Sequence, residues 1–136
     1  MYISIKKLLK EGKLAQEVTL KGWVRTFRSN RFIALNDGSC LENVQVVVDF
    51  EHTDEALLRR ITTGAAVEVE GTVVESQGKG QAIEVQAAKL KVLGDSNPEE
   101  YPIQPKKHSL EFLRENAHLR VRTNAFGAIM RVRSTL

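Results

Sequence analysis

Six side chains on or beside predicted strands have the chemistry to recognise a nucleic acid: Arg25, Arg28, Arg31, Phe32, Gln45 and Glu84. An exposed aromatic ring can stack on an unpaired base, and a guanidinium can bind a phosphate or a base edge. An amide offers a donor and an acceptor to a base edge, and a carboxylate accepts from the amino and imino groups of guanine. On one shared face these groups predict binding of single-stranded RNA. We identify no catalytic residue beside them.

These side chains must be positioned by strands, because the hydrophobic period between residues 18 and 93 is mostly two. Strands are predicted at 18–27, 31–35, 43–50, 67–74 and 82–93. A helix capped by Thr53 or Asp54 and stopped by Gly64 separates the third strand from the fourth, and a helix capped by Ser4 precedes the first. The order β-β-β-α-β-β predicts a five-stranded OB-fold, an all-β barrel with short helices. A small β-sandwich with one helix is the alternative.

Alternation within the strands predicts which side chains leave the core. Ile33 and Leu35 occupy the inner face of the second strand, so Phe32 is expected to point outward. The same parity places Gln45 and Glu84 outward on the third and fifth strands. Phe32 is the most informative of the three, because a lone aromatic in a strand usually belongs to the core.

In the first strand, parity places Lys21, Arg25 and Phe27 outward, and Gly22 indicates a bend or a close backbone approach. Four basic residues lie within 21–31, where there is no acidic residue. The chain as a whole carries a net charge of only +3 at pH 7. The local run is therefore the better indicator of a basic, RNA-binding face.

Composition and spacing argue against several other functions. The three histidines, His52, His108 and His118, lack metal-ligand spacing, and Cys40 is single, so neither a metal site nor an internal disulfide is expected. The glycine-rich segment 77–81 has no following helix and no GKS or GKT, which argues against a phosphate-binding loop. No apolar run approaches the ~20 residues of a membrane span. We expect a cytoplasmic protein with no membrane partner.

The barrel is expected to end before a proline-rich segment. With 42% hydrophobic residues in 136, the chain can bury one substantial core. We predict a barrel domain at 1–95, a linker at 96–108 and the start of a second domain at 109–136. In that last part, Ser109 can cap a helix at 110–119, and Thr123 or Asn124 can cap a helix that is still running at Leu136. We therefore expect the front of a longer protein.

Short motifs across the chain resemble the N-terminal anticodon-binding domain of class IIb aminoacyl-tRNA synthetases, the aspartyl, asparaginyl and lysyl enzymes. They are KGWVR at 21–25, FIALNDGS at 32–39 and VQVV at 44–47. The tail, HSLEFLRENAHLRVRTN at 108–124, is more specific, since it resembles the junction to the catalytic domain in bacterial asparaginyl enzymes. It differs at Val121, where many members carry proline.

The resemblance implies roles for four residues. Phe32 matches the aromatic residue that stacks on the central anticodon uridine, and Gln45 matches the glutamine that recognises it. Arg28 matches an anticodon-loop arginine. Glu84 matches the acidic residue that recognises the first anticodon base, guanine or its modified form.

The resemblance also implies a whole enzyme that attaches asparagine to tRNA with ATP and Mg²⁺. Its catalytic motifs would lie beyond Leu136, and the helix from Ala125 resembles class II motif 1, which builds the homodimer interface. Three other interpretations stay open here. They are the same domain of an aspartyl enzyme, a free-standing OB-fold that binds single strands, and a protein-interaction module anchored by Phe32.

Overall fold

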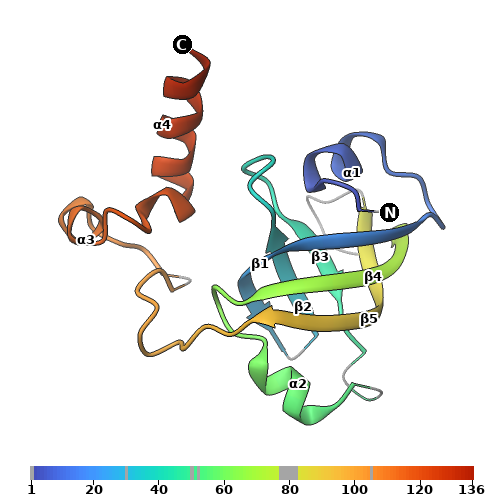
Figure 1. Ribbon diagram of the computed structural model, residues 1–136. Helices are drawn as coiled ribbons and strands as arrows, with labels where there is room; N and C mark the ends of the chain where they lie inside the picture. The colour runs from blue at the N-terminus through green and yellow to red at the C-terminus, as the bar shows by residue number, and fades with distance from the viewer. Residues whose placement is uncertain (1, 30, 50, 52, 77–82, 105) are drawn as a thin grey trace.

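The computed structural model describes residues 2–29, 31–49, 51, 53–76, 83–104 and 106–136. Five strands form a closed barrel in the order β1-β2-β3-β5-β4, with β4 pairing back onto β1 (Figure 1). The strands are β1 (Glu17–Arg28), β2 (Phe32–Asn36), β3 (Val44–Val47), β4 (Ala66–Glu75) and β5 (Ile83–Gly94). The predicted OB-fold is confirmed. Neighbouring strands pair antiparallel except β3 and β5, which pair in parallel.

Two short helices lie at opposite ends of the barrel (Figure 1). Helix α1 (Ile5–Glu11) is capped by Ser4, as predicted, and buries Ile5 and Leu8 in the core. Its first turn is bound to the β2–β3 loop, where Ile5 N donates to Asp37 Oδ2 at 2.9 Å. Helix α2 (Glu55–Arg60) begins at an Asp54 cap and precedes β4.

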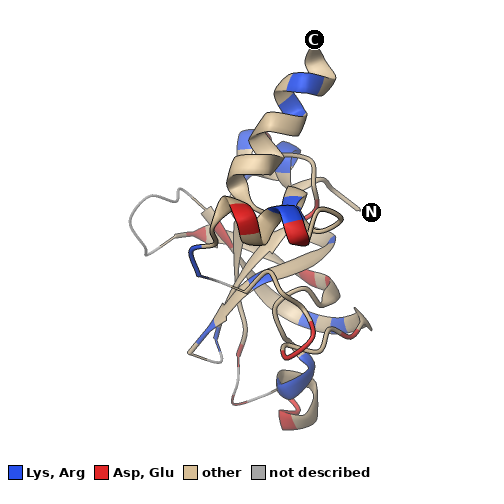
Figure 2. Cartoon of the chain, turned by 90° about the vertical axis from the view of Figure 1, so that its left-hand side faces the viewer, with Lys and Arg blue, Asp and Glu red and all other residues tan. Residues whose placement is uncertain are grey.

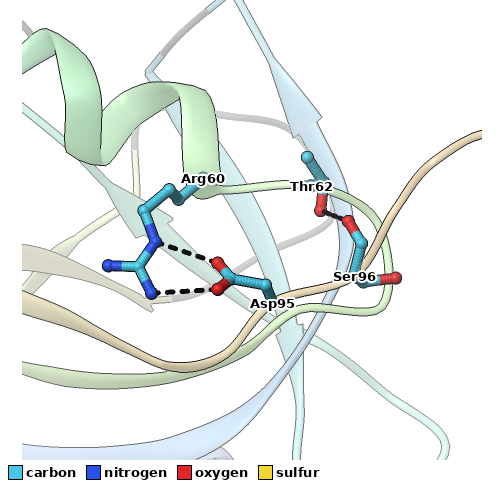
Figure 3. Close-up of polar contacts among 4 residues, drawn as sticks. All are labelled: Arg60, Thr62, Asp95 and Ser96. Carbon is cyan, nitrogen blue, oxygen red and sulfur yellow. Dashed lines mark hydrogen bonds and ion pairs between the residues drawn. The ribbon is translucent and has the colours of Figure 1, made fainter.

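The end of α2 is bound to the chain that leaves β5 (Figure 3). Arg60 donates to both carboxylate oxygens of Asp95, with Nε–Oδ1 at 2.9 Å and Nη2–Oδ2 at 3.2 Å, and Thr62 Oγ1 donates to Ser96 O. The hydrogen bond from Arg60 holds the pKa of Asp95 below its ordinary value. Both side chains are exposed, so the ion pair mainly orients this exit and adds little stability.

Strand β1 contains a β-bulge at Arg25 that reverses its alternation. Val24 pairs with Leu35 and Thr26 pairs with Ala34, which leaves Arg25 as the extra residue. Val24 faces the core before the bulge, and Phe27, which is opposite Ile33, packs against the core after it. The prediction that Phe27 points outward was therefore wrong.

Gly22 brings the first half of β1 close to the backbone of β2. A Cβ atom at Gly22 would lie 2.3 Å from the carbonyl oxygen of Asn36, a separation that backbone cannot accommodate without moving. The predicted close approach is confirmed. Asn36 itself is buried, and its amide donates to Asn43 Oδ1 at 2.9 Å and accepts from Gly38 N at 2.7 Å. It thereby holds the β2–β3 loop in place.

Beyond the barrel, the tail forms α3 (Leu110–Glu115), a 3₁₀ turn η1 (Arg120–Arg122) and α4 (Asn124–Thr135). Ser109 and Thr123 are the caps, and α3 ends earlier than the predicted 119. The tail contacts the barrel through Arg122, whose guanidinium carbon lies 3.8 Å from the centre of the Trp23 ring. No helix among the described residues has the length and apolar character needed to cross a membrane.

Replacing Gly22 by alanine is expected to destabilise the barrel by about 1–3 kcal/mol, because β1 and β2 would have to separate. Gly94→Ala is the matched control, since its Cβ would meet only Ala66 Cβ at 3.7 Å. Urea unfolding followed by circular dichroism measures both variants. Equal stability of the two variants would show that the approach at Gly22 is not constraining.

Candidate nucleic-acid interface

A groove of about 850 Å³ on the outside of the barrel brings together five of the six predicted residues. They are Arg28, Arg31, Phe32, Gln45 and Glu84. They come from the end of β1, the turn after it, and β2, β3 and β5. These strands are neighbours in the order β1-β2-β3-β5, so the groove crosses a continuous part of the sheet.

Phe32 is half-buried and lies outside the core, as the alternation of β2 predicts. It is opposite Val47 on β3 and Arg28 on β1, while the next residue, Ile33, is fully buried. Its ring borders the main groove and a second hollow of about 430 Å³ on the same face. The Arg31 guanidinium carbon lies 5.6 Å from the ring centre. Phe32 therefore offers an apolar platform with a cation beside it.

Gln45 and Glu84 form a hydrogen-bonded pair on the floor of this groove. Val46 pairs with Val85 in the parallel β3–β5 ladder, which sets the preceding residues of the two strands side by side. Gln45 Nε2 donates to Glu84 Oε2 at 2.7 Å. Glu84 lies on the predicted outer face, but only 8% of its surface is exposed, so it is far less open than an outward strand residue would suggest.

The bulge at Arg25 is what brings Arg28 to the groove. Without the extra residue, Arg28 would share the inward parity of Val24; with it, Arg28 is opposite Phe32. Arg31 is exposed and follows in the turn before β2. Two arginines from the β1–β2 side therefore line the same groove as Glu75 of β4 and Glu84 of β5.

Arg25 lies outside this groove, apart from the other five predicted residues. Its Nη1 donates to Asn124 Oδ1 at 2.8 Å, at the start of α4. Burial, with a further contribution from Arg122 nearby, lowers the pKa of Arg25. Lys21 is also separate, because its ammonium lies 3.9 Å from the centre of the Tyr2 ring. The basic run of β1 thus serves different surfaces, and Lys and Arg are spread over barrel and tail in Figure 2.

Among the groove residues that the sequence analysis did not assign to the site, one carries a carboxylate and one an amide. Gln86 is exposed and shares the outer face of β5 with Glu84, and Glu75 lies at the end of β4, opposite Ile83. Gln86 could have been found, because it follows Glu84 by two positions in an alternating strand. Nothing in the local sequence of Glu75 indicates this surface. No group of three His, Cys, Asp or Glu side chains that could hold a metal ion occurs within the described ranges.

Comparison with known proteins identifies the barrel. Residues 18–93 match the family model labelled tRNA anti-codon and described as an OB-fold nucleic acid binding domain. The chain belongs to this family. The matched residues begin within β1 and end within β5, so they include all five strands and therefore the whole groove.

Relatives extend the similarity into the tail. Asparagine--tRNA ligase from Porphyromonas gingivalis is 56% identical over 125 residues, which cover 90% of this chain and 27% of the relative. Asparagine--tRNA ligase from Cytophaga hutchinsonii is 51% identical over 98% of this chain and 30% of the relative. Asparaginyl-tRNA synthetase from Pyrococcus horikoshii complexed with asparaginyl-adenylate superposes with a TM-score of 0.79 at 27% identity, over 99% of this chain and 32% of that one. The chain thus spans 27–32% of these relatives' length.

Truncating two adjacent residues of β2 tests the assignment of faces. Ile33→Ala is expected to lower the free energy of unfolding by about 2–5 kcal/mol, because Ile33 is fully enclosed. Phe32→Ala is expected to lower the free energy of unfolding much less, because the Phe32 ring is partly exposed to water and is not among the side chains packed in the core. Urea titration of both variants gives the comparison. A larger loss at Phe32 than at Ile33 would mean that the phenyl ring supports the core.

Proposed function

We propose that this chain is the anticodon-binding part of an asparaginyl-tRNA synthetase. The observation that carries the proposal is the shared groove of Arg28, Phe32, Gln45 and Glu84 on one outer face of an OB-fold barrel. The identity of 56% to an asparagine--tRNA ligase over most of the chain supports the choice of enzyme. The aspartyl alternative, the free-standing binder and the protein-interaction module have no comparable observation in their favour.

In this proposal the groove binds the unpaired anticodon loop. Phe32 stacks on the central uridine, which contributes about 1–3 kcal/mol by the measure of alanine substitution. Gln45 recognises the edge of that uridine, and Glu84 accepts from the first base, a guanine or its modified form. Arg28 and Arg31 bind phosphates at the β1–β2 side of the groove, where their charge attracts the RNA without depending on its sequence.

For the longer protein, we propose attachment of asparagine to tRNA with ATP and Mg²⁺, in the cytoplasm. In this proposal the barrel supplies recognition and binding energy, and the ATP chemistry occurs in another part of the enzyme. We propose a barrel domain at 1–95, a linker at 96–108 and the start of the catalytic domain at 109–136. The exposed apolar side chains of Ile129, Met130 and Val132 on α4 support a homodimer that covers this helix.

The whole-protein proposal predicts charging of one tRNA. By the genetic code, asparagine tRNA carries the anticodon GUU and aspartate tRNA carries GUC. The longer protein should attach radiolabelled asparagine to the GUU transcript, with the product detected by acid precipitation. Charging of the GUC transcript with aspartate would favour the aspartyl alternative, and charging of neither would reject the synthetase assignment.

The stacking role of Phe32 predicts weaker binding in one variant. Phe32→Ala is expected to weaken binding of an anticodon stem-loop with GUU by about 1–3 kcal/mol, because the base loses its platform. Phe32→Tyr, which keeps the ring, should bind close to the wild type. Fluorescence anisotropy with a labelled stem-loop measures both affinities. Unchanged affinity of a folded Phe32→Ala chain would remove stacking from the proposal.

Two arginines of β1 provide a second test, because only one borders the groove. Arg28→Ala should weaken binding of the stem-loop. It should also reduce the magnitude of the slope of log binding constant against log salt concentration by about 0.7, the contribution of one phosphate contact on a single strand. Arg25→Ala should leave both quantities near the wild-type values, since Arg25 binds Asn124. Titrations at several salt concentrations measure the slopes. An equal loss in the two variants would mean that the RNA is bound by total charge and not by the groove.

A further inference from the structure

We infer that Glu84 is a positioning residue that sets the selectivity of Gln45, in addition to any contact of its own with RNA. The inference rests on the proposed function and concerns how the central base is recognised. A glutamine amide has a donating NH₂ end and an accepting carbonyl end, so the base that it recognises depends on which end is turned toward that base. The hydrogen bond between Gln45 and Glu84 decides that orientation.

An ionised carboxylate can only accept hydrogen bonds, so Glu84 binds the NH₂ end of Gln45 and not its carbonyl end. The bond is short, at 2.7 Å, and Glu84 is 92% enclosed, conditions that strengthen a charge-assisted contact. A flipped amide would place two acceptor oxygens together in this nearly dry setting. Glu84 thus selects one of the two amide orientations before any RNA arrives.

The carbonyl oxygen of Gln45 then becomes the group presented to the groove. Gln45 Oε1 has no hydrogen-bond partner within the part of the chain that the structure describes, and no buried side-chain oxygen there lacks one. Gln45 is half-buried and borders both hollows beside Phe32. A base stacked on Phe32 would meet an acceptor from Gln45.

An acceptor that faces N3 of the base distinguishes the two pyrimidines. Uracil carries a proton on N3 and can donate it to Gln45 Oε1. Cytosine has an unprotonated N3, which is itself an acceptor, so its lone pair would face another lone pair. In a partly enclosed site, two acceptors left without hydrogen bonds cost free energy, and this cost discriminates strongly against cytosine. Glu84 therefore favours uracil over cytosine at the central position without touching that base.

The test is a double-mutant cycle on base selectivity. Stem-loops with GUU and GCU anticodons are titrated against the full chain. The selectivity ratio is the dissociation constant for GCU divided by that for GUU. It is measured for the wild type, Glu84→Ala, Gln45→Ala and the double variant. Glu84→Ala is expected to lower the ratio about tenfold, the equivalent of one well-made hydrogen bond. Gln45→Ala should lower it similarly, and the double variant should show no further loss. Glu70→Ala, an exposed carboxylate on β4 outside the groove, is the matched control.

The outcomes separate this inference from the proposed function. If the wild type binds both stem-loops equally, the anticodon assignment fails and the inference fails with it. The positioning role alone is rejected if the wild type discriminates and Glu84→Ala has the same ratio of dissociation constants as the wild type. It is also rejected if the fold-change of that ratio in the double variant equals the product of the fold-changes in the two single variants. Should Glu84→Ala not fold, Glu84→Met keeps a side chain of similar length and still removes the acceptor.

The free protein gives an independent spectroscopic readout. One Gln45 Nε2 proton, bonded to the carboxylate, should resonate downfield of exposed glutamine amides in a ¹H–¹⁵N spectrum, and it should return to the ordinary position in Glu84→Met. A Gln45 signal that does not change between these two proteins would contradict the orientation on which the inference depends.

Discussion

The β-bulge at Arg25 is the constraint on which the recognition surface depends. A strand that alternated without interruption from Val18 would turn Arg28 into the barrel and Phe27 out of it. The extra residue exchanges them, so that Phe27 joins the core opposite Ile33 and Arg28 joins the outer face opposite Phe32. A charged guanidinium inside a barrel of this size would be prohibitively costly, and a phenyl ring outside it would waste apolar surface. One inserted residue resolves both problems and also bends β1 around the barrel.

The same residue separates two functions within a single strand. Arg25 leaves the ladder at the bulge and binds Asn124 at the start of α4, while Arg28, three residues later, borders the groove. Arg122 approaches the same part of β1 from the tail and stacks on Trp23. The strand that contributes to the recognition surface at one end is thus bound to the tail near its middle.

The parts of this structure that followed from the sequence are those governed by uninterrupted alternation. The five strands, the two end-capping helices and the outward direction of Phe32 and Gln45 needed only a period of two and the usual caps. Phe27 was placed on the wrong face because a bulge without a glycine leaves no mark in the hydrophobic pattern, and the same bulge separates Arg25 from the groove. Arg28 was predicted from the basic run 21–31 and from the family resemblance, because it lies beyond the predicted strand 18–27, where parity assigns no face. The near-complete burial of Glu84 depends on the parallel pairing of β3 with β5, strands that are distant in the sequence, and no local pattern reports that.

Affinity and selectivity in this groove would come from different kinds of groups. Every base has a flat face, so a stacking platform such as Phe32 and the phosphate contacts of Arg28 and Arg31 hold any unpaired loop. Discrimination requires groups whose donors and acceptors are fixed before binding, because a freely turning amide can match either pyrimidine. The Gln45–Glu84 pair meets that requirement: its members lie on adjacent strands of a closed barrel, and its carboxylate is too enclosed for water to replace the bond easily. The rigid ladder between β3 and β5 thereby contributes to selectivity as well as to stability, since any sliding of the two strands would release the amide.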